Sequence, residues 1–320
     1  MNLRCIVGLA FVSLAAAQAA PPQAAIANAR IHAQLYLPDA QSGYYQGTRF
    51  DWSGVISSLE WNGHSYFGQW FPRYDPKLHD AITGPVEEFS GLGYDEVKVG
   101  ESFVRIGVGA VRKRDEPAYR QFTTYDIVDP GTRTVHRSSD RVEFIHALKE
   151  TAGYAYEYRK TVRLKGSTLV LEHRLKNTGR KPIATSVYEH DFFMLDRQPT
   201  GPDFVVRFPF DLTAVAPLNG LAEIRGKDFV YLQELQTGQT VQTQLKGWGP
   251  TAKDYDFRLE NRKTGAGVHQ TGDRPITKFN LWSIRTNISP EAYVDLTVLP
   301  GQTTTWNITY EFYQMPKARP

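Results

Sequence analysis

The sequence is poor in sulfur and nearly balanced in charge. Its 320 residues include a single cysteine, Cys5, so neither an intrachain disulfide nor a multi-cysteine metal site can form. There are 37 basic and 34 acidic residues, which give a formal charge of +3. No extended run of lysine or arginine supplies the basic surface that nucleic-acid binding requires, so we expect no nucleic-acid partner.

The sequence motifs of several enzyme classes are also missing. There is no G-x-S-x-G nucleophile motif, no H-E-x-x-H zinc motif and no EF-hand spacing. The glycines of Gly107-Val108-Gly109 lie inside a strand-like pattern with no helix after them, so we interpret them as a place of close sheet packing. We expect no cofactor and no dedicated metal site.

The first 19 residues have the pattern of a secretory signal peptide. A positive residue precedes the apolar stretch 5–17, and Ala17-Gln18-Ala19 supplies the small residues that a signal peptidase recognises. The apolar stretch is short for a membrane span, with a retained anchor as the alternative. We therefore expect a periplasmic or secreted protein without membrane attachment. Residues 20–28, rich in alanine and proline, predict a linker, and residues 29–320 predict a single domain.

Long amphipathic helices are absent from the pattern, which instead consists of short alternating segments joined by turns. Segments at about ten-residue spacing are typical of a large antiparallel sandwich or barrel, so the predicted class is all-β. Aromatic residues, at 12%, fill the core for the most part and leave some rings to stack on sugars. The predicted strands are 50–61, 64–71, 103–111, 119–128, 142–148, 154–164, 169–175, 183–193, 204–208, 228–232, 240–245, 256–260, 279–284, 293–298 and 304–312.

Tyr74–Phe89 (YDPKLHDAITGPVEEF) is polar, rich in turn residues and without strand periodicity. Loops of this length are often functional, so we expect His79, Glu87 and Glu88 to bind substrate hydroxyls. Carboxylates together with His79 also suit a calcium ion, although the spacing does not demand one. The sequence leaves both readings of this loop open.

Three stretches resemble the galactose mutarotase-like superfamily, which includes the aldose 1-epimerases. They are TRFDWSGVISSLEWNG at 48–63, SVYEHDFF at 186–193, and a late glutamate, Glu291, before PGQTTTWNITYEF at 300–312. The resemblance implies a β-supersandwich, in which two large curved antiparallel sheets hold a sugar in a concave groove. It also implies an aldose 1-epimerase-type mutarotase, which interconverts sugar anomers without a metal or nucleotide.

The resemblance assigns roles to particular residues. His190 corresponds to the catalytic histidine and is expected to act as the acid, with Glu291 as the base about a sugar ring away. His79 corresponds to a second histidine from an early loop, and Glu189 stands where epimerases carry asparagine. A solvated loop carboxylate after Pro290 is the alternative reading of Glu291.

Strand alternation adds a prediction about faces in this central stretch. His190 should share one face with Tyr188 and Phe192, which we expect to bind the sugar, while Glu189 and Asp191 lie on the other. Their negative charge is expected to keep His190 protonated. Arg49 precedes a predicted strand and is expected to donate two hydrogen bonds to sugar hydroxyls, with a surface salt bridge as the alternative.

Two other functions fit the same residues. One is a non-catalytic carbohydrate-binding protein, and the other is a polysaccharide lyase or hydrolase on the same fold, although no additional helical domain is evident. In each case the expected partner is a sugar or the end of an oligosaccharide. The sequence leaves open which sugar is bound and whether the protein is a monomer or a homodimer.

Overall fold

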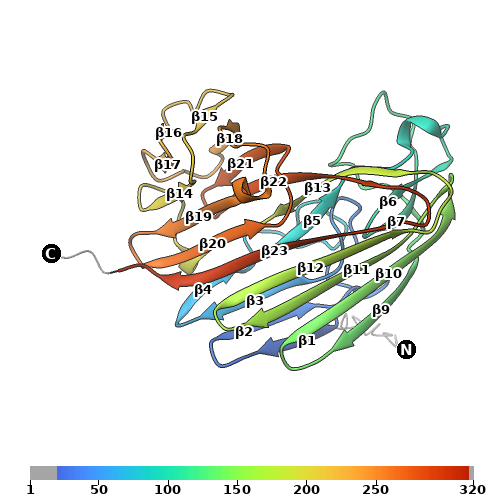
Figure 1. Cartoon of the computed structure of the whole chain (residues 1–320), viewed down its shortest axis with the longest axis horizontal. Helices are drawn as coiled ribbons and strands as arrows, with labels where there is room; N and C mark the ends of the chain where they lie inside the picture. The colour runs from blue at the N-terminus through green and yellow to red at the C-terminus, as the bar shows by residue number, and fades with distance from the viewer. Residues whose placement is uncertain (1–19, 317–320) are drawn as a thin grey trace, which may run out of the picture.

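A computed structural model describes residues 20–316, which form an almost entirely β-stranded protein (Figure 1). The predicted signal peptide lies outside the described residues. None of the helices among residues 20–316 is long and apolar enough to cross a membrane. The strands are β1 (Gln23–Ala27), β2 (Ile31–Tyr36), β3 (Val55–Trp61), β4 (His64–Phe67), β5 (Val86–Phe89), β6 (Ser102–Arg105), β7 (Gly109–Arg112), β8 (Ile127–Asp129), β9 (Thr132–Arg137), β10 (Arg141–Thr151), β11 (Tyr154–Lys165), β12 (Thr168–Asn177), β13 (Ile183–His190), β14 (Phe204–Arg207), β15 (Thr213–Ala214), β16 (Ala222–Arg225), β17 (Asp228–Tyr231), β18 (Thr240–Lys246), β19 (Asp256–Asn261), β20 (Ala266–Gly272), β21 (Lys278–Ile284), β22 (Asn287–Val298) and β23 (Thr303–Gln314).

Two large antiparallel sheets dominate the fold, as the all-β prediction required. The larger has the strand order β16-β17-β14-β19-β20-β23-β12-β11-β10-β9, and the smaller has the order β15-β18-β21-β22-β13-β5. A four-stranded sheet, β1-β2-β3-β4, and a three-stranded sheet, β6-β7-β8, complete the described structure. In Figure 1 the long strands β9 to β12 and β23 run side by side, with β13, β21 and β22 above them.

Alternation of buried and exposed side chains explains why these segments are strands. In β18 (TVQTQLK) every second residue is buried, and β12 repeats the same two-residue period over its whole length. The buried faces of the two large sheets meet in one core, where Phe89 packs edge-on against Tyr158 and Trp306. A second, smaller apolar cluster gathers around Phe50 and Phe192.

Several predicted elements at the N-terminal side are wrong. Residues 23–27 are not a linker, because they form β1 and pair with β2. The predicted strand 103–111 is instead the hairpin of β6 and β7, and it turns at Gly107, whose φ is +83°. A β-carbon at Gly107 would lie 2.6 Å from the Asp51 side chain, so this glycine allows a tight turn against another loop. Of the predicted strand 119–128, only its end belongs to a strand.

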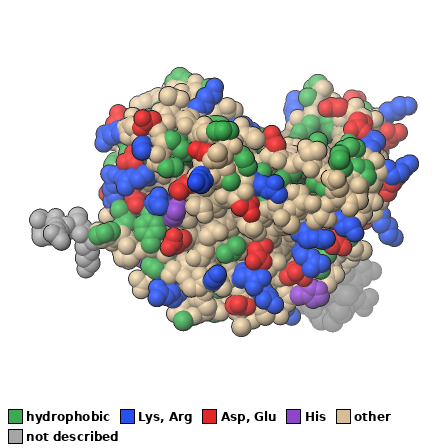
Figure 2. All heavy atoms as spheres, in the orientation of Figure 1, with side chains coloured by type: hydrophobic (Ala, Val, Ile, Leu, Met, Phe, Trp, Pro, Cys, Tyr) green, Lys and Arg blue, Asp and Glu red, His purple; other side chains and the backbone are tan. Residues whose placement is uncertain are grey.

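Figure 2 shows one face of the molecule, whose outline is indented between two lobes. Basic and acidic side chains are mixed across this face, and neither sign forms a continuous patch there. The mixture agrees with the nearly balanced composition. The face shown has no continuous basic patch of the kind that a polyanion site needs.

Candidate functional site

A cavity of about 130 Å³ opens on the face of the six-stranded sheet that points away from the core. Alternation places Asn280 and Trp282 of β21 on this face, while Leu281 between them is buried in the core. Loop residues close the cavity from the other side. Its lining residues are Arg49, Asp80, Gln121, Phe122, Tyr188, His190, Phe192, Gln242, Asn280, Trp282, Glu291 and Tyr293.

His190 and Glu291 meet at the floor of this cavity. Nε2 of His190 lies 3.3 Å from Oε1 of Glu291, and the two side chains are only 4% and 6% exposed. Glu291 belongs to β22, so its interpretation as a solvated loop carboxylate is wrong. The expected separation of a whole sugar ring is also wrong, since the two groups are in direct contact. The two oxygens that mutarotation involves are bonded to the same carbon, so an adjacent pair can reach both.

The imidazole of His190 is held by aromatic rings. It stacks on Phe192 with ring centroids 3.7 Å apart, and Trp282 meets it edge-on at 5.3 Å. His190 and Tyr188 share a face of β13, which confirms the prediction from strand alternation for these two residues. Phe192 lies beyond the end of the strand, at a φ of +48°, and lines the same cavity. Nδ1 is buried and has no hydrogen-bond partner among residues 20–316, whereas Nε2 faces Glu291. The geometry therefore assigns Nε2 as the nitrogen available for proton transfer.

The structure reverses the protonation states expected for this pair, which were a protonated His190 and an ionised Glu291. Burial, and then the positive charge of Arg49, lower the pKa of His190 well below its ordinary value. Burial raises the pKa of Glu291 to about 8, although Arg49 and Asn280 act in the opposite direction. At neutral pH the resting pair is therefore a neutral imidazole beside a protonated carboxyl. Glu189 and Asp191 do not hold His190 protonated, because they point to the other face of the strand.

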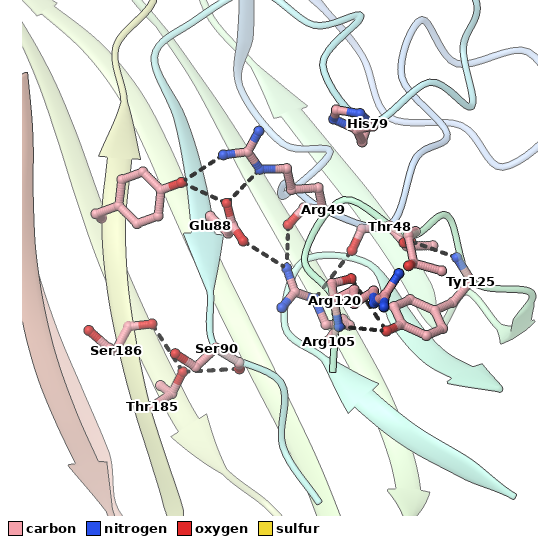
Figure 3. A network of polar contacts seen from close by, with 12 residues as sticks. Thr48, Arg49, His79, Glu88, Ser90, Arg105, Arg120, Tyr125, Thr185 and Ser186 are labelled. Atoms are coloured by element: carbon pink, nitrogen blue, oxygen red, sulfur yellow. Dashed lines mark hydrogen bonds and ion pairs between the residues drawn. The ribbon is translucent and has the colours of Figure 1, made fainter. Parts of the chain in front are cut away.

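Arg49 connects the cavity to the neighbouring strands (Figure 3). Its Nε donates to Glu88 Oε2 at 2.7 Å, its Nη2 donates to the Tyr188 hydroxyl at 3.1 Å, and its Nη1 pairs with Asp80. Burial lowers the pKa of the guanidinium, but Tyr188, Glu88 and Asp80 together raise it well above its ordinary value. This is a buried ion pair, so the alternative of a surface salt bridge is wrong. Arg49 supplies a fixed positive charge beside the cavity.

The structure places the three residues predicted from the loop in three different environments. Glu88 holds Arg49 and accepts a hydrogen bond of 2.6 Å from the Tyr188 hydroxyl, so it supports the cavity wall. His79 does not line the cavity; its Nδ1 lies 2.9 Å from Asp80 Oδ1, and Figure 3 shows it apart from the bonded network. Glu87 is wrong as a sugar ligand, because its side chain is fully buried on the opposite face of β5.

Glu87 instead belongs to a charged cluster between the two large sheets. Its carboxylate accepts hydrogen bonds from Lys160 Nζ at 2.5 Å and from His173 Nε2 at 2.7 Å. The other ring nitrogen of His173 lies 3.2 Å from the Trp306 carbonyl oxygen. Both ring nitrogens of His173 therefore face oxygen atoms of neighbouring residues. Burial raises the pKa of Glu87, but Lys160 and His173 outweigh it and lower that pKa to about 2.

The charges of this cluster are balanced by its own side chains, without a metal ion. Glu87, His173 and Glu189 offer ligand atoms within 4.8 Å of one another. However, the Lys160 ammonium already neutralises Glu87 at hydrogen-bond distance. Burial and the charge of Glu87 raise the pKa of Glu189 well above its ordinary value, which favours a neutral carboxyl there. The cluster is a buried ionic support behind the strand that carries His190.

Sequence reasoning missed several lining residues, of which two from β21 stand out. The Asn280 amide donates to the Tyr293 hydroxyl at 3.1 Å and lies 3.4 Å from Glu291 Oε2, so it orients the carboxyl. Trp282 is half-buried and offers a ring to the cavity. The alternation in KFNLWSI predicted the strand correctly. The alternation did not indicate that Asn280, on the polar face of that strand, contacts Glu291.

Comparison with known proteins establishes the fold. No family model matches the chain, and no curated protein sequence matches it. Among solved structures, the chain is similar to a galactose mutarotase related enzyme from Lactobacillus acidophilus, with a TM-score of 0.57 and 13% identity over 93% of this chain and 100% of that one. A GalM/aldose epimerase homologue from C. elegans gives the same values.

A galactose mutarotase-like protein from Clostridium acetobutylicum has a TM-score of 0.57 and 13% identity, covering 92% of this chain and 95% of that one. Identities at this level establish the fold alone. The chain therefore has the galactose mutarotase-like fold, which confirms the fold that the sequence resemblance implied.

Proposed function

We propose that the protein is an aldose 1-epimerase-type mutarotase, which opens a sugar ring and closes it on the other face. The observation that carries this proposal is the contact of 3.3 Å between His190 Nε2 and Glu291 Oε1 at the floor of an aromatic-lined cavity. A proton donor and a proton acceptor stand side by side there. They suit the two oxygens attached to the anomeric carbon.

The ring-opening step uses the resting protonation of the pair. The Glu291 carboxyl gives its proton to the ring oxygen as the bond from that oxygen to C1 breaks. His190 Nε2 takes the proton of the C1 hydroxyl, and the electron pair of that O–H bond forms the aldehyde carbonyl. C1 then rotates about its bond to C2, and the reverse transfers close the ring. Each placed proton transfer contributes about 10²–10⁴-fold in rate.

The charges around the pair support this cycle. Ring opening leaves an imidazolium on His190 next to a carboxylate on Glu291, and opposite charges in contact stabilise each other. The fixed positive charge of Arg49 favours the Glu291 carboxylate, as its effect on the Glu291 pKa indicates. Arg49 also disfavours the imidazolium, so the stabilisation of the open-chain state comes from the contact between the two opposite charges themselves.

A carbohydrate-binding protein without catalysis is the second candidate. Phe122, with 54% of its surface exposed, stands at the rim of the cavity near the half-buried Trp282, and such rings stack on sugars in binding proteins. The near-complete burial of His190 and Glu291 also favours this candidate, since little of either side chain is open to a ligand.

Polarimetry separates the two candidates. Freshly dissolved single anomers of several hexoses, pentoses and uronic acids would be followed with and without the protein. The mutarotase proposal predicts faster loss of the optical rotation of at least one sugar. The binding candidate predicts unchanged relaxation together with saturable binding, measured by calorimetry on the same panel.

We also propose a periplasmic or secreted location, on the strength of the N-terminal signal-peptide pattern. N-terminal sequencing of the protein from a periplasmic or culture-medium fraction tests it. A mature N-terminus near Ala19 or Ala20 is expected, whereas an intact Met1 would contradict it.

A further inference from the structure

A second hollow adjoins the first on the same face of the six-stranded sheet. It measures about 280 Å³, and its lining includes Tyr119, Ser186 and Lys278. Tyr188, Tyr293 and Gln121 line both hollows, so the two share a wall. We call these two adjoining hollows the groove; His190 and Glu291 lie in the first of them.

The strand register shows how this groove is built. Tyr188 of β13 pairs with Tyr293 of β22, and Tyr293 pairs with Lys278 of β21. Glu291 and Asn280 are the next pair on the same face, two residues along the strands. Two residues along a strand span about 7 Å. The pair Glu291 and Asn280 is therefore separated from the row Tyr188, Tyr293 and Lys278 by a distance comparable to the step between neighbouring rings of an oligosaccharide.

The groove opens as it runs away from the catalytic pair. Along β22, Glu291 is buried, Tyr293 is half-buried and Asp295 is exposed. Along β13, His190 is buried, whereas Ser186 is half-exposed. In Figure 3, Ser186 of β13 and Ser90, which directly follows β5, lie beyond Glu88, on the side away from Arg49. A chain of sugars can therefore place its terminal unit at the closed end and continue toward solvent.

The second hollow contains a charged donor that the protein itself does not use. Lys278 Nζ stands 3.5 Å from the centre of the Tyr293 ring, and none of the ion pairs among residues 20–316 includes it. The other charged groups nearby are Glu88, which Arg49 engages, and Asp95, Asp295 and Arg105. An ammonium placed on an aromatic face beside a groove is suited to bond an acceptor oxygen of a ligand.

The opposite wall is fixed by packing. Tyr119 stacks on Tyr125 with centroids 5.9 Å apart and meets Phe103 edge-on at 6.1 Å. The Tyr125 hydroxyl in turn donates to Glu116 at 2.5 Å. The loop that carries Gln121 is therefore anchored by aromatic contacts, and the second hollow has walls on both sides.

We propose that the substrate is a carbohydrate of at least two units, with the reducing unit at His190 and Glu291 and the next unit in the second hollow beside Lys278. This inference rests on the proposed mutarotase function and names its substrate class. The unit in the second hollow gains an interaction with the Lys278 ammonium and a contact with the part of Tyr119 that lines the hollow. A monosaccharide cannot make these contacts, so a disaccharide should be the better substrate.

The test compares anomer exchange of reducing disaccharides, with 1,4 and 1,6 linkages, against glucose and galactose. The measured quantity is the ratio of kcat/KM for the best disaccharide to that for its reducing monosaccharide. Ser186→Trp fills the second hollow and should lower this ratio at least tenfold. Lys278→Met removes the free donor and should lower it about tenfold, the loss of one hydrogen bond from a charged group. Thr297→Trp, an exposed position further along the same face, is the matched control and should keep the ratio.

The outcomes separate this inference from the function on which it rests. Exchange of monosaccharides with a ratio near one, unaffected by Ser186→Trp, would overturn the two-unit substrate and leave the mutarotase intact. Absence of exchange for every sugar in the panel would overturn both. A large ratio that falls in Ser186→Trp and Lys278→Met but not in Thr297→Trp would support the proposal. Circular dichroism checks that all three variants remain folded.

Discussion

Replacing Glu291 by glutamine should change how the stability of the protein depends on pH. Raising a carboxyl pKa from 4.5 in the unfolded chain to about 8 in the folded protein corresponds to about 5 kcal/mol of unfolding free energy. The Glu291 carboxyl is 6% exposed, so solvent screens little of this effect. Its sign follows from proton binding, because the folded protein holds the proton more tightly. The contribution is fully present below pH 4.5 and is lost as the pH rises through about 8.

The assay is urea unfolding of the wild type and Glu291→Gln at pH 5, 7 and 9. Glutamine keeps the shape of the side chain but cannot ionise. The free energy of unfolding of the variant should therefore rise by several kcal/mol, relative to that of the wild type, between pH 5 and pH 9. Asp295→Asn, an exposed carboxyl two positions further along the strand, is the matched control and should run parallel to the wild type. Parallel curves for Glu291→Gln as well would refute the protonated resting state of Glu291.

Three further predictions follow from the same geometry. The exchange rate constant kcat/KM should fall about tenfold per pH unit above pH 8, as Glu291 loses the proton it gives to the ring oxygen; a flat profile between pH 8 and 10 would contradict this role. Lys160→Met should destabilise the fold by about 3–5 kcal/mol in urea unfolding, because it leaves the buried Glu87 carboxylate without the ammonium that pairs with it, whereas an effect below 1 kcal/mol would show that the cluster is neutral. Gly84→Ala should lower kcat/KM about 100-fold, since a β-carbon there would lie 2.7 Å from the His190 carbonyl oxygen and displace that strand end. Gly68→Ala, where the nearest atom is 3.6 Å away, should retain the wild-type rate.

Local patterns predicted the all-β class, and the family resemblance named both His190 and Glu291, which the structure brings into contact. Alternation in SVYEHDFF placed His190 with Tyr188, because strand geometry fixes which side chains share a face, whereas Phe192 reaches the same cavity from beyond the end of the strand. The same rule predicted most strands of the two large sheets. It failed at Gly107, where a turn needing a positive φ lies within an apolar run that resembles a continuous strand.

The electrostatics of the site could not be predicted from local patterns. Glu189 and Asp191 adjoin His190 in sequence, yet their carboxyls lie on the other face of the strand, and the charge that matters comes from Arg49 across the cavity. Glu87 looked like a loop carboxylate because the sequence does not show that Lys160 and His173, more than 70 residues later, face it across the sandwich. Protonation depends on burial and on such long-range partners.

The most direct test of the account is the exchange of magnetisation between the anomeric protons of a reducing sugar, measured by NMR with catalytic amounts of protein. The account predicts that the wild type accelerates exchange, and that His190→Gln and Glu291→Gln each lose at least 100-fold while still binding the sugar. Equal exchange rates for the wild type and both variants would contradict the roles of Glu291 as proton donor and His190 as proton acceptor.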